Sequence, residues 1–290
     1  MIEPGSAEWL SIITPSKVAA ILGVSRWESP FRLWHRMKGN VPPEPPKDIF
    51  NVGHAFEAAL AELWKLENPG WQLSPGEVQI RNDFGFPTLA TLDRRARRGR
   101  ARKAVQFKTA RKLEEWGDFG SDQAPADYVA AEQWEMHVTG YTKQPAELMV
   151  MGPFFEHFTY RIPYEPYLCM TIEQRCREFV DSLQADEPPD LDDSVPSYEC
   201  VRQLHPEIED REVQIDPELA AEYLDAARSH KESETRLRGL KTRVLDVLDG
   251  GHIALAGTYK VADRRPAKGG NVALYPNPKT SIDDLKDLIA

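Results

Sequence analysis

The sequence predicts a mixed α/β (α+β) fold that ends in a long helix and a β extension. Helix-type and strand-type hydrophobic patterns alternate over roughly the first two thirds of the 290-residue chain. An acidic, proline-rich stretch then interrupts them, and the longest helical pattern of the chain follows. These observations divide the chain into a core at residues 1–185, a linker at 186–213 and an extension at 214–290.

Capping residues and periodicity mark the first helices. Thr14 is a suitable N-cap and Pro15 a suitable first helical residue, which predicts a short helix that continues over residues 16–22. Ser29-Pro30 predicts the start of a second helix in the same way. A third helix is expected over residues 51–66, where apolar side chains recur at steps of three and four residues.

Short apolar runs bounded by turn residues predict the strands of the core. The expected strands lie at residues 77–81, 87–93, 103–109, 145–151 and 156–162. Two further helices complete the core, at residues 126–139 and 166–184. In the extension, Asp216-Pro217 begins a helix that reaches Leu248, and a single strand near residues 253–263 follows it.

Charge is distributed unevenly along the chain. The net charge of −10 argues by itself against nucleic acid as a partner. The interval from Arg94 to Lys112, however, holds ten basic residues and no acidic one. A basic patch on an acidic body favours contact with a polyanion at one place, and the alternative is a solvated arginine-rich loop. The candidate DNA-binding residues of this interval are Arg94, Arg95, Arg97, Arg98, Arg100, Arg102 and Arg111.

Composition also excludes several classes of protein. Three cysteines without a C-x-x-C pair argue against a disulfide framework, a structural zinc site and a four-cysteine iron–sulfur cluster. No apolar run approaches the roughly 18 residues that a membrane span requires. The N-terminus lacks the basic and apolar regions of a signal peptide, which predicts a cytoplasmic protein without a membrane partner.

Two neighbouring segments, Thr91-Leu92-Asp93 and Gln106-Phe107-Lys108, form the candidate catalytic site. Asp93 ends one expected strand, and Gln106 and Lys108 share a face of the next because strand side chains alternate. A carboxylate followed by a carboxylate-x-Lys pattern provides hard oxygen ligands for a divalent cation with a lysine beside them, as a metal-dependent phosphodiesterase needs. Where such a pattern normally has Asp or Glu, this chain has Gln106.

The ordered motifs resemble the YqaJ-like viral recombinase group of the PD-(D/E)XK nuclease superfamily, which contains the phage lambda exonuclease. The resemblance covers roughly residues 10–185 and implies a restriction-endonuclease-like core, with a central mixed sheet flanked by helices. The matching segments are Ile13–Ser16, Ala20–Ser25, Gly53–Glu57, Ala90–Asp93, Gln106–Thr109, Trp116-Gly117 and Tyr128–Gly140.

The resemblance also implies roles for individual residues. The implied ligands of Mg²⁺ or Mn²⁺ are Asp93, Gln106, the backbone carbonyl of Phe107 and, directly or through water, Glu57. Lys108 would orient or deprotonate the attacking water, and Gln133 would hold the lysine or the scissile phosphate. Ser16 would help to bind a terminal 5′-phosphate with its hydroxyl and the amides of its helix N-terminus.

By the same resemblance, the protein is expected to be a Mg²⁺-dependent exonuclease of phage-type homologous recombination in a bacterial host cell. It would enter at a linear double-stranded DNA end, degrade one strand from 5′ to 3′, and leave a single strand for an annealing or recombination protein. The alternative is a non-catalytic accessory protein that binds DNA ends. The oligomeric state stays open between a trimeric ring and a monomer.

Two positions depart from the family pattern. Gln106 stands where family members have Glu, so one negative charge is lost and metal affinity and activity are expected to fall. Gln106 is either an engineered inactivating change or a natural residue of a weak, tuned or binding-only protein. If only a charge is missing, Gln106→Glu should raise turnover at least about tenfold, on the order of 1.4 kcal/mol. An arginine expected before the Ile-Thr-x-Ser motif is also absent, and Trp9 lies near its place.

Overall fold

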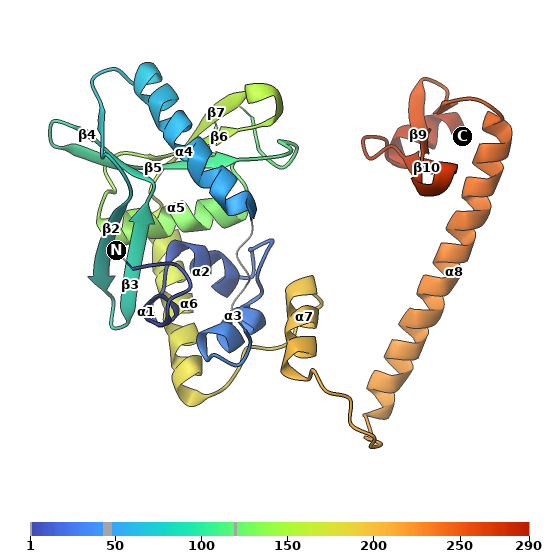
Figure 1. The fold of residues 1–290 in the computed structure, drawn as a ribbon, viewed down its shortest axis with the longest axis horizontal. Coiled ribbons are helices and arrows are strands. Elements are labelled where there is room, and N and C mark those ends of the chain that lie inside the picture. The colour runs from blue at the N-terminus through green and yellow to red at the C-terminus, as the bar shows by residue number, and fades with distance from the viewer. Residues whose placement is uncertain (1, 43–47, 119–120, 290) are drawn as a thin grey trace. The chain divides into compact units, whose positions relative to one another are not determined.

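The computed structural model describes residues 2–42, 48–118 and 121–289 and divides the chain into two compact units. The first unit spans Met1–Ile208 and the second Glu209–Ala290 (Figure 1). The helices of the first unit are α1 (Ala7–Leu10), α2 (Pro15–Ile21), α3 (Pro30–Met37), α4 (Asp48–Glu67), α5 (Ala126–Thr139), α6 (Pro166–Ala185) and α7 (Val195–Leu204). Its strands are β1 (Gln72–Leu73), β2 (Val78–Asp83), β3 (Pro87–Leu92), β4 (Arg94–Arg98), β5 (Ala101–Thr109), β6 (Ala146–Met151) and β7 (His157–Ile162), with a 3-10 turn, η1 (Pro153–Phe155), before the last.

A mixed five-stranded sheet forms the centre of the first unit. Its strand order is β1-β4-β5-β6-β7. β5 and β6 run parallel, and the other neighbouring pairs of this sheet are antiparallel. β2 and β3 form a separate antiparallel pair. The prediction of a central mixed sheet within an α/β core is therefore confirmed.

Helices cover both faces of the five-stranded sheet. The side chain of Phe107 on β5 packs in one cluster with Leu60 and Trp64 of α4. Ala104 on the same strand packs in another cluster with Met136 of α5. Because residues an odd number apart on a strand point to opposite faces, α4 and α5 lie on opposite sides of the sheet (Figure 1). α2 and α6 pack in turn against α5.

The predicted capping residues begin the predicted helices. Thr14 is the N-cap of α2, with Pro15 in the first turn. The hydroxyl of Ser29 accepts a hydrogen bond from the N–H of Arg32 at the start of α3. α4 begins at Asp48, three residues before the point that its apolar periodicity predicts. Local side-chain chemistry therefore places these helix starts to within a few residues.

The arginine-rich interval is a β-hairpin rather than a loop, which corrects one interpretation of the sequence. β4 pairs with β5 from Arg94 opposite Val105 to Arg98 opposite Ala101. Gly99 in the connecting turn has a φ of +58°, a left-handed conformation that glycine adopts without strain. In β4, arginines lie on both faces and Ala96 is the one apolar residue, so strand pairing rather than hydrophobic alternation marks that strand.

The predicted linker at residues 186–213 contains a helix that belongs to the first unit. α7 packs against α3, where Cys200 is fully buried in a cluster with Phe31. The hydroxyl of Ser197 donates a hydrogen bond to the hydroxyl of Ser29 at 2.7 Å. Burial of these side chains holds α7 on the core. The sequence did not predict α7 because its short apolar face lies within an acidic and proline-rich stretch.

The second unit consists of a long helix and a three-stranded sheet. α8 (Pro217–Leu248) begins after Asp216, whose carboxylate accepts hydrogen bonds from the N–H groups of Glu218 and Leu219. The predicted single strand near residues 253–263 is instead a hairpin, and a third strand pairs with it in the order β10-β9-β8. The remaining elements are β8 (Ile253–Ala256), β9 (Tyr259–Pro266), η2 (Lys268–Gly270), β10 (Val272–Pro276), η3 (Asp283–Leu285) and α9 (Lys286–Ile289). In the described part of the chain, no helix is long and apolar enough to cross a membrane.

Candidate active site

Asp93 lies where the chain passes from one sheet into another. β3 ends at Leu92 in the two-stranded sheet, and β4 begins at Arg94 in the five-stranded sheet. The β4–β5 ladder stops at the pair of Arg94 and Val105. Beyond that pair the carboxylate of Asp93 replaces a strand partner, because its Oδ2 accepts a hydrogen bond from the backbone N–H of Phe107 at 2.7 Å. A buried carboxylate is thereby held beside β5.

The backbone carbonyl of Phe107 is available on the same side. In a strand the N–H and C=O groups of one residue point in the same direction. Since the N–H of Phe107 is bonded to Asp93, its carbonyl oxygen also faces the Asp93 side of β5. The role of this carbonyl as a metal ligand, which the family resemblance implies, is compatible with that direction.

Gln106 and Lys108 share a face of β5, as their alternation predicts. Lys108 Nζ lies 3.3 Å from Asp93 Oδ2 and 3.5 Å from Gln106 Oε1. Burial would lower the pKa of Lys108, but the charges of Asp93, Glu135 and Glu132 outweigh burial and raise it. Lys108 is therefore held as an ammonium ion. In this state its ammonium group can orient a water molecule or neutralise a phosphate oxygen. Lys108 could accept a proton from water only after losing one of its own protons.

Glu57 of α4 is a further carboxylate close to Asp93. Its side chain is half-buried, and burial raises its pKa, an effect that the charge of Asp93 increases. Lys108 and His54 act in the opposite direction. Since Glu57 responds to both Asp93 and Lys108, it belongs to the same electrostatic cluster. Of the predicted residues, Asp93, Gln106, Phe107 and Lys108 are joined by direct polar contacts, and Glu57 is linked to them by charge alone.

Two buried glutamates on α5 join this cluster, although sequence reasoning assigned them no role. Gln106 Nε2 donates hydrogen bonds to Glu135 Oε1 at 2.6 Å and to the carbonyl of Thr91 at 3.2 Å. Glu132 and Glu135 are only 2% and 3% exposed. Burial raises the pKa of Glu132 to about 8 and that of Glu135 well above its usual range. Their spacing of three residues, which places both on one helix face, was the available signal.

The oxygen atoms of this cluster fit a hard divalent cation. Among the described residues, no three Asp, Glu, His or Cys side chains by themselves form a metal site. The donor set near Asp93, however, also includes the Gln106 amide oxygen and the Phe107 carbonyl. Within the described part of the chain, the Oε2 atoms of Glu132 and Glu135 are buried and have no hydrogen-bond partner. A buried carboxylate oxygen without a partner is unfavourable, and coordination of a cation would relieve it.

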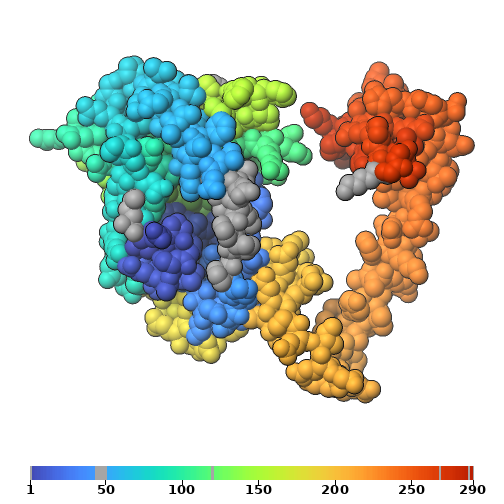
Figure 2. Space-filling model, in the orientation of Figure 1, coloured from blue at the N-terminus to red at the C-terminus, as the bar shows by residue number. Residues whose placement is uncertain are grey.

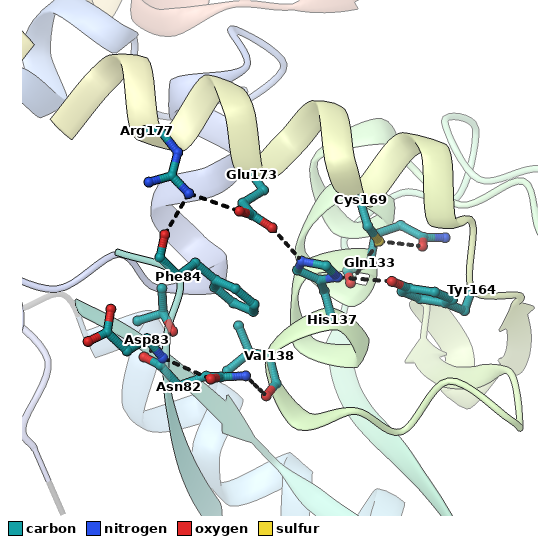
Figure 3. A network of polar contacts seen from close by, with 11 residues as sticks. Asn82, Asp83, Phe84, Gln133, His137, Val138, Tyr164, Cys169, Glu173 and Arg177 are labelled. Carbon is teal, nitrogen blue, oxygen red and sulfur yellow. Dashed lines mark hydrogen bonds and ion pairs between the residues drawn. The ribbon is translucent and has the colours of Figure 1, made fainter. Parts of the chain in front are cut away.

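Gln133 does not belong to this cluster. Its Nε2 donates a hydrogen bond to the carbonyl of Pro163 at 2.7 Å, and its Oε1 accepts one from the N–H of Glu165 at 3.0 Å. Figure 3 shows the side chain within the polar network that joins α5 to α6. Adjacent positions on a helix are turned about 100° from each other, so Gln133 and Glu132 cannot both face β5. The structure therefore does not bring Gln133 to Lys108.

The arginines of the β4–β5 hairpin form a basic surface. This hairpin projects from the first unit at the left of Figures 1 and 2. The strand register places Arg95, Arg97 and Arg102 on the face that carries Gln106, and Arg94 and Arg98 on the opposite face. Within the described residues, none of these arginines, nor Arg100 or Arg111, forms an ion pair with a carboxylate. Unpaired arginines on an acidic protein are suited to an anionic partner.

Lys103 of the same basic interval has a different role. It is buried, and its Nζ forms an ion pair with Glu147 Oε1 at 2.6 Å. The indole N–H of Trp64 donates a hydrogen bond to the other oxygen of Glu147 at 2.8 Å. Lys103 therefore stabilises the packing of α4 on the sheet and is not part of the basic surface.

Ser16 lies exposed in the first turn of α2, with its Oγ 3.2 Å from Thr14 Oγ1. α2 packs against α5 and β3, which also position the candidate site. The adjacent Lys17 is not available to a phosphate because its ammonium group is fully engaged by backbone carbonyls. The carbonyls that accept hydrogen bonds from Lys17 Nζ are those of Trp9, Leu10 and Ile12.

Comparison with known proteins finds a family model, a bacterial protein and solved structures to which parts of this chain are similar. Residues 8–142 match the family model of the YqaJ-like viral recombinase domain. The chain is 22% identical over 265 residues to the uncharacterized protein YqaJ of Bacillus subtilis (strain 168), an alignment that covers 87% of this chain and 81% of that protein. Among solved structures, the alkaline exonuclease LHK-Exo of Laribacter hongkongensis is similar at 17% identity and a TM-score of 0.48, over 64% of this chain and 94% of that one. A complex of LHK-Exo with dAMP gives 18% identity and a TM-score of 0.49, over 62% and 91%.

Proposed function

We propose that this protein is a divalent-metal-dependent DNA exonuclease, a proposal supported by the match of residues 8–142 to the model of the YqaJ-like viral recombinase domain. The observation that carries the proposal is the meeting of Asp93, Gln106 and Lys108 at the end of the β4–β5 ladder. Beside them lie the unpartnered carboxylate oxygens of Glu132 and Glu135. Hydrolysis of a phosphodiester requires neutralisation of negative charge and an activated water molecule, and this group of side chains is suited to both.

The residues of the site divide the work between metal binding and phosphate binding. Bound Mg²⁺ or Mn²⁺ supplies Lewis acidity toward a phosphoryl oxygen. Asp93, Glu57 and the carbonyl oxygen of Phe107 are proposed to hold the cation. Lys108, kept as an ammonium ion by the surrounding carboxylates, is proposed to hold the attacking water or a non-bridging phosphate oxygen. Gln106 contributes an amide oxygen on the same side as Lys108.

The proposed substrate is the end of a linear DNA duplex, degraded from 5′ to 3′. The basic surface of the hairpin is proposed to bind the phosphate backbone, and the net charge of −10 disfavours binding elsewhere on the protein. Ser16, exposed at the start of α2, is proposed to contact a terminal 5′-phosphate. The strand left behind would be the substrate of a single-strand annealing or recombination protein.

A nuclease assay tests this function. The purified protein is incubated with a linear duplex labelled at the 5′ or the 3′ end and with a closed circle of the same sequence, in Mg²⁺, in Mn²⁺ and in EDTA. We expect metal-dependent release of nucleotides from the linear duplex alone, with the 5′ label released first. Asp93→Ala should abolish this activity, whereas Asp181→Ala, an exposed carboxylate on α6, should not change it.

The opposite result would support the accessory-protein alternative, which Gln106 favours because it lacks a carboxylate at the usual position. Binding to DNA ends without cleavage in either metal would establish that alternative.

A second measurement tests the 5′-phosphate site: the ratio of the cleavage rates on 5′-phosphorylated and 5′-hydroxyl duplexes. Ser16→Ala should lower that ratio and Ser11→Ala should leave it unchanged. A ratio of one in the unchanged protein would exclude a 5′-phosphate site.

A further inference from the structure

The surroundings of Gln106 are not those of a site that has merely lost a carboxylate. A glutamine amide carries two N–H donors and one oxygen. Both donors of Gln106 are used, by Glu135 at 2.6 Å and by the carbonyl of Thr91 at 3.2 Å. Its oxygen lies toward Lys108. An ionised glutamate at this position would have no proton to donate to Glu135 and would instead bring two carboxylate oxygens into contact.

We propose that Glu135 supplies the second carboxylate of the cation site and that Gln106 is a positioning residue that holds it. The carboxylate that β5 lacks at position 106 is then supplied by α5, from Glu135, which is hydrogen-bonded to Gln106. This assignment rests on the proposed function for the presence of a divalent cation, but it does not depend on what the protein does to DNA.

The unused oxygen of Glu135 supports this assignment. One carboxylate oxygen accepts the hydrogen bond from Gln106, while the other is buried and has no partner among the described residues. Glu132, one helical turn earlier, also has a buried oxygen without a partner there. A carboxylate retained only to orient Gln106 would gain nothing from a second oxygen sealed away from water. A cation gives both unpartnered oxygens a function.

The balance of charge in the cluster leads to the same conclusion. Three buried carboxylates, those of Asp93, Glu132 and Glu135, act on the single ammonium group of Lys108. When all four groups are ionised, three negative charges and one positive charge leave a net charge of −2. A divalent cation neutralises that charge, and hard oxygen ligands are the ones that Mg²⁺ and Mn²⁺ prefer.

The same contact bears on the origin of Gln106. If Gln106 had replaced an original glutamate, the carboxylate of that glutamate would have lain in contact with the carboxylate of Glu135. Two carboxylates at that separation cannot both be ionised without a strong increase in the pKa of one. The complementary pair of amide and carboxylate is instead consistent with a natural glutamine. The tenfold gain expected for Gln106→Glu from the sequence alone is therefore not expected from the structure.

An exchange of the two side chains tests the assignment. Mn²⁺ affinity is measured by calorimetry without DNA for the unchanged protein, Glu135→Gln, Glu135→Ala and the exchange variant Gln106→Glu/Glu135→Gln. Glu135→Gln and Glu135→Ala should each weaken Mn²⁺ binding at least about tenfold, the lower end of what loss of a group that supports a metal site causes. The exchange variant should return to within about threefold of the unchanged protein, because it again contains one carboxylate and one amide.

A matched control separates this effect from loss of folding. Glu147→Gln removes a carboxylate that is equally buried but lies on the opposite face of the sheet, and it should leave Mn²⁺ affinity unchanged. Urea unfolding of each variant reports the folded fraction. Unchanged affinity in folded Glu135→Gln would overturn the assignment. An exchange variant that binds Mn²⁺ more than about tenfold better than the unchanged protein would also overturn it, since position 106 would then be the true ligand.

These results can be separated from those of the nuclease assay. If Glu135→Gln weakens Mn²⁺ binding and no DNA is cleaved, the proposed function fails and the assignment of Glu135 stands. If linear DNA is degraded and Glu135→Gln binds Mn²⁺ normally, the function stands and the assignment fails.

Discussion

The two faces of the β4–β5 hairpin allow a sharp test of DNA binding by the basic surface. Arg95 and Arg97 lie on the face that carries Gln106, and Arg94 and Arg98 lie on the other face. The pairs are matched, since each has one half-buried and one exposed arginine. If DNA reaches the candidate site along the first face, Arg95→Ala/Arg97→Ala removes two phosphate contacts. The slope of log K against log salt should then become shallower by about 1.8, at about 0.9 per contact.

The size of this effect is measurable with ordinary binding assays. Between 50 and 200 mM salt, a change of about 1.8 in slope makes the loss of affinity roughly tenfold greater at the lower salt concentration. Fluorescence anisotropy with a labelled duplex, in Ca²⁺ to prevent cleavage, gives the required affinities. Arg94→Ala/Arg98→Ala should change the slope by less than about half as much. Equal slopes for the two variants, or weaker binding at an unchanged slope, would refute contact along the Gln106 face.

Three further predictions concern stability. Asp93→Ala removes the acceptor of the Phe107 N–H and should lower the free energy of unfolding in urea by roughly 1–3 kcal/mol, whereas Asp93→Asn, which retains an acceptor, should cost clearly less. Lys103→Met should destabilise the protein by at most about 3–5 kcal/mol because it leaves the buried Glu147 with only the more distant Arg161, at 3.5 Å, as a cationic partner, and Lys103→Met/Glu147→Gln should recover part of that loss. Without metal, thermal stability should fall as pH rises from 4.5 to about 8, because the unfolded chain loses the Glu132 proton before the folded chain does. Glu132→Gln should flatten this dependence, and an identical pH profile would contradict the role of Glu132.

The parts of the fold that depend on local chemistry could be predicted from the sequence. The N-caps Thr14, Ser29 and Asp216 begin helices because the signals lie within a few residues of each helix start. β5 was predicted as residues 103–109, but β4 was missed because arginines occupy both of its faces, so no alternation of polar and apolar residues marks it. The turn that separates β8 from β9 was missed because it depends on Gly257. Gly257 has a φ of +58°, and the residues beside it do not indicate a turn.

The sequence predicts those site residues that lie on β5 or directly before β4. Asp93 and Lys108 meet as their motif predicts. Gln133 contacts Pro163 and Glu165 rather than Lys108, a difference that the sequence could not show because it does not reveal which face of a helix meets the sheet. Glu135 was missed for a related reason. Its partner Gln106 lies 29 residues away, and their contact exists only after α5 packs on β5.

The hydrogen bond between Asp93 and Phe107 has a consequence for how this site tolerates sequence drift. The donor is a backbone amide, which every residue except proline provides. The side chain at position 107 points away from the site, into the apolar cluster beneath α4. Substitutions there can adjust the packing of α4 while the carboxylate stays in place. Proline is the one replacement that should displace Asp93 without altering any side chain of the acidic cluster.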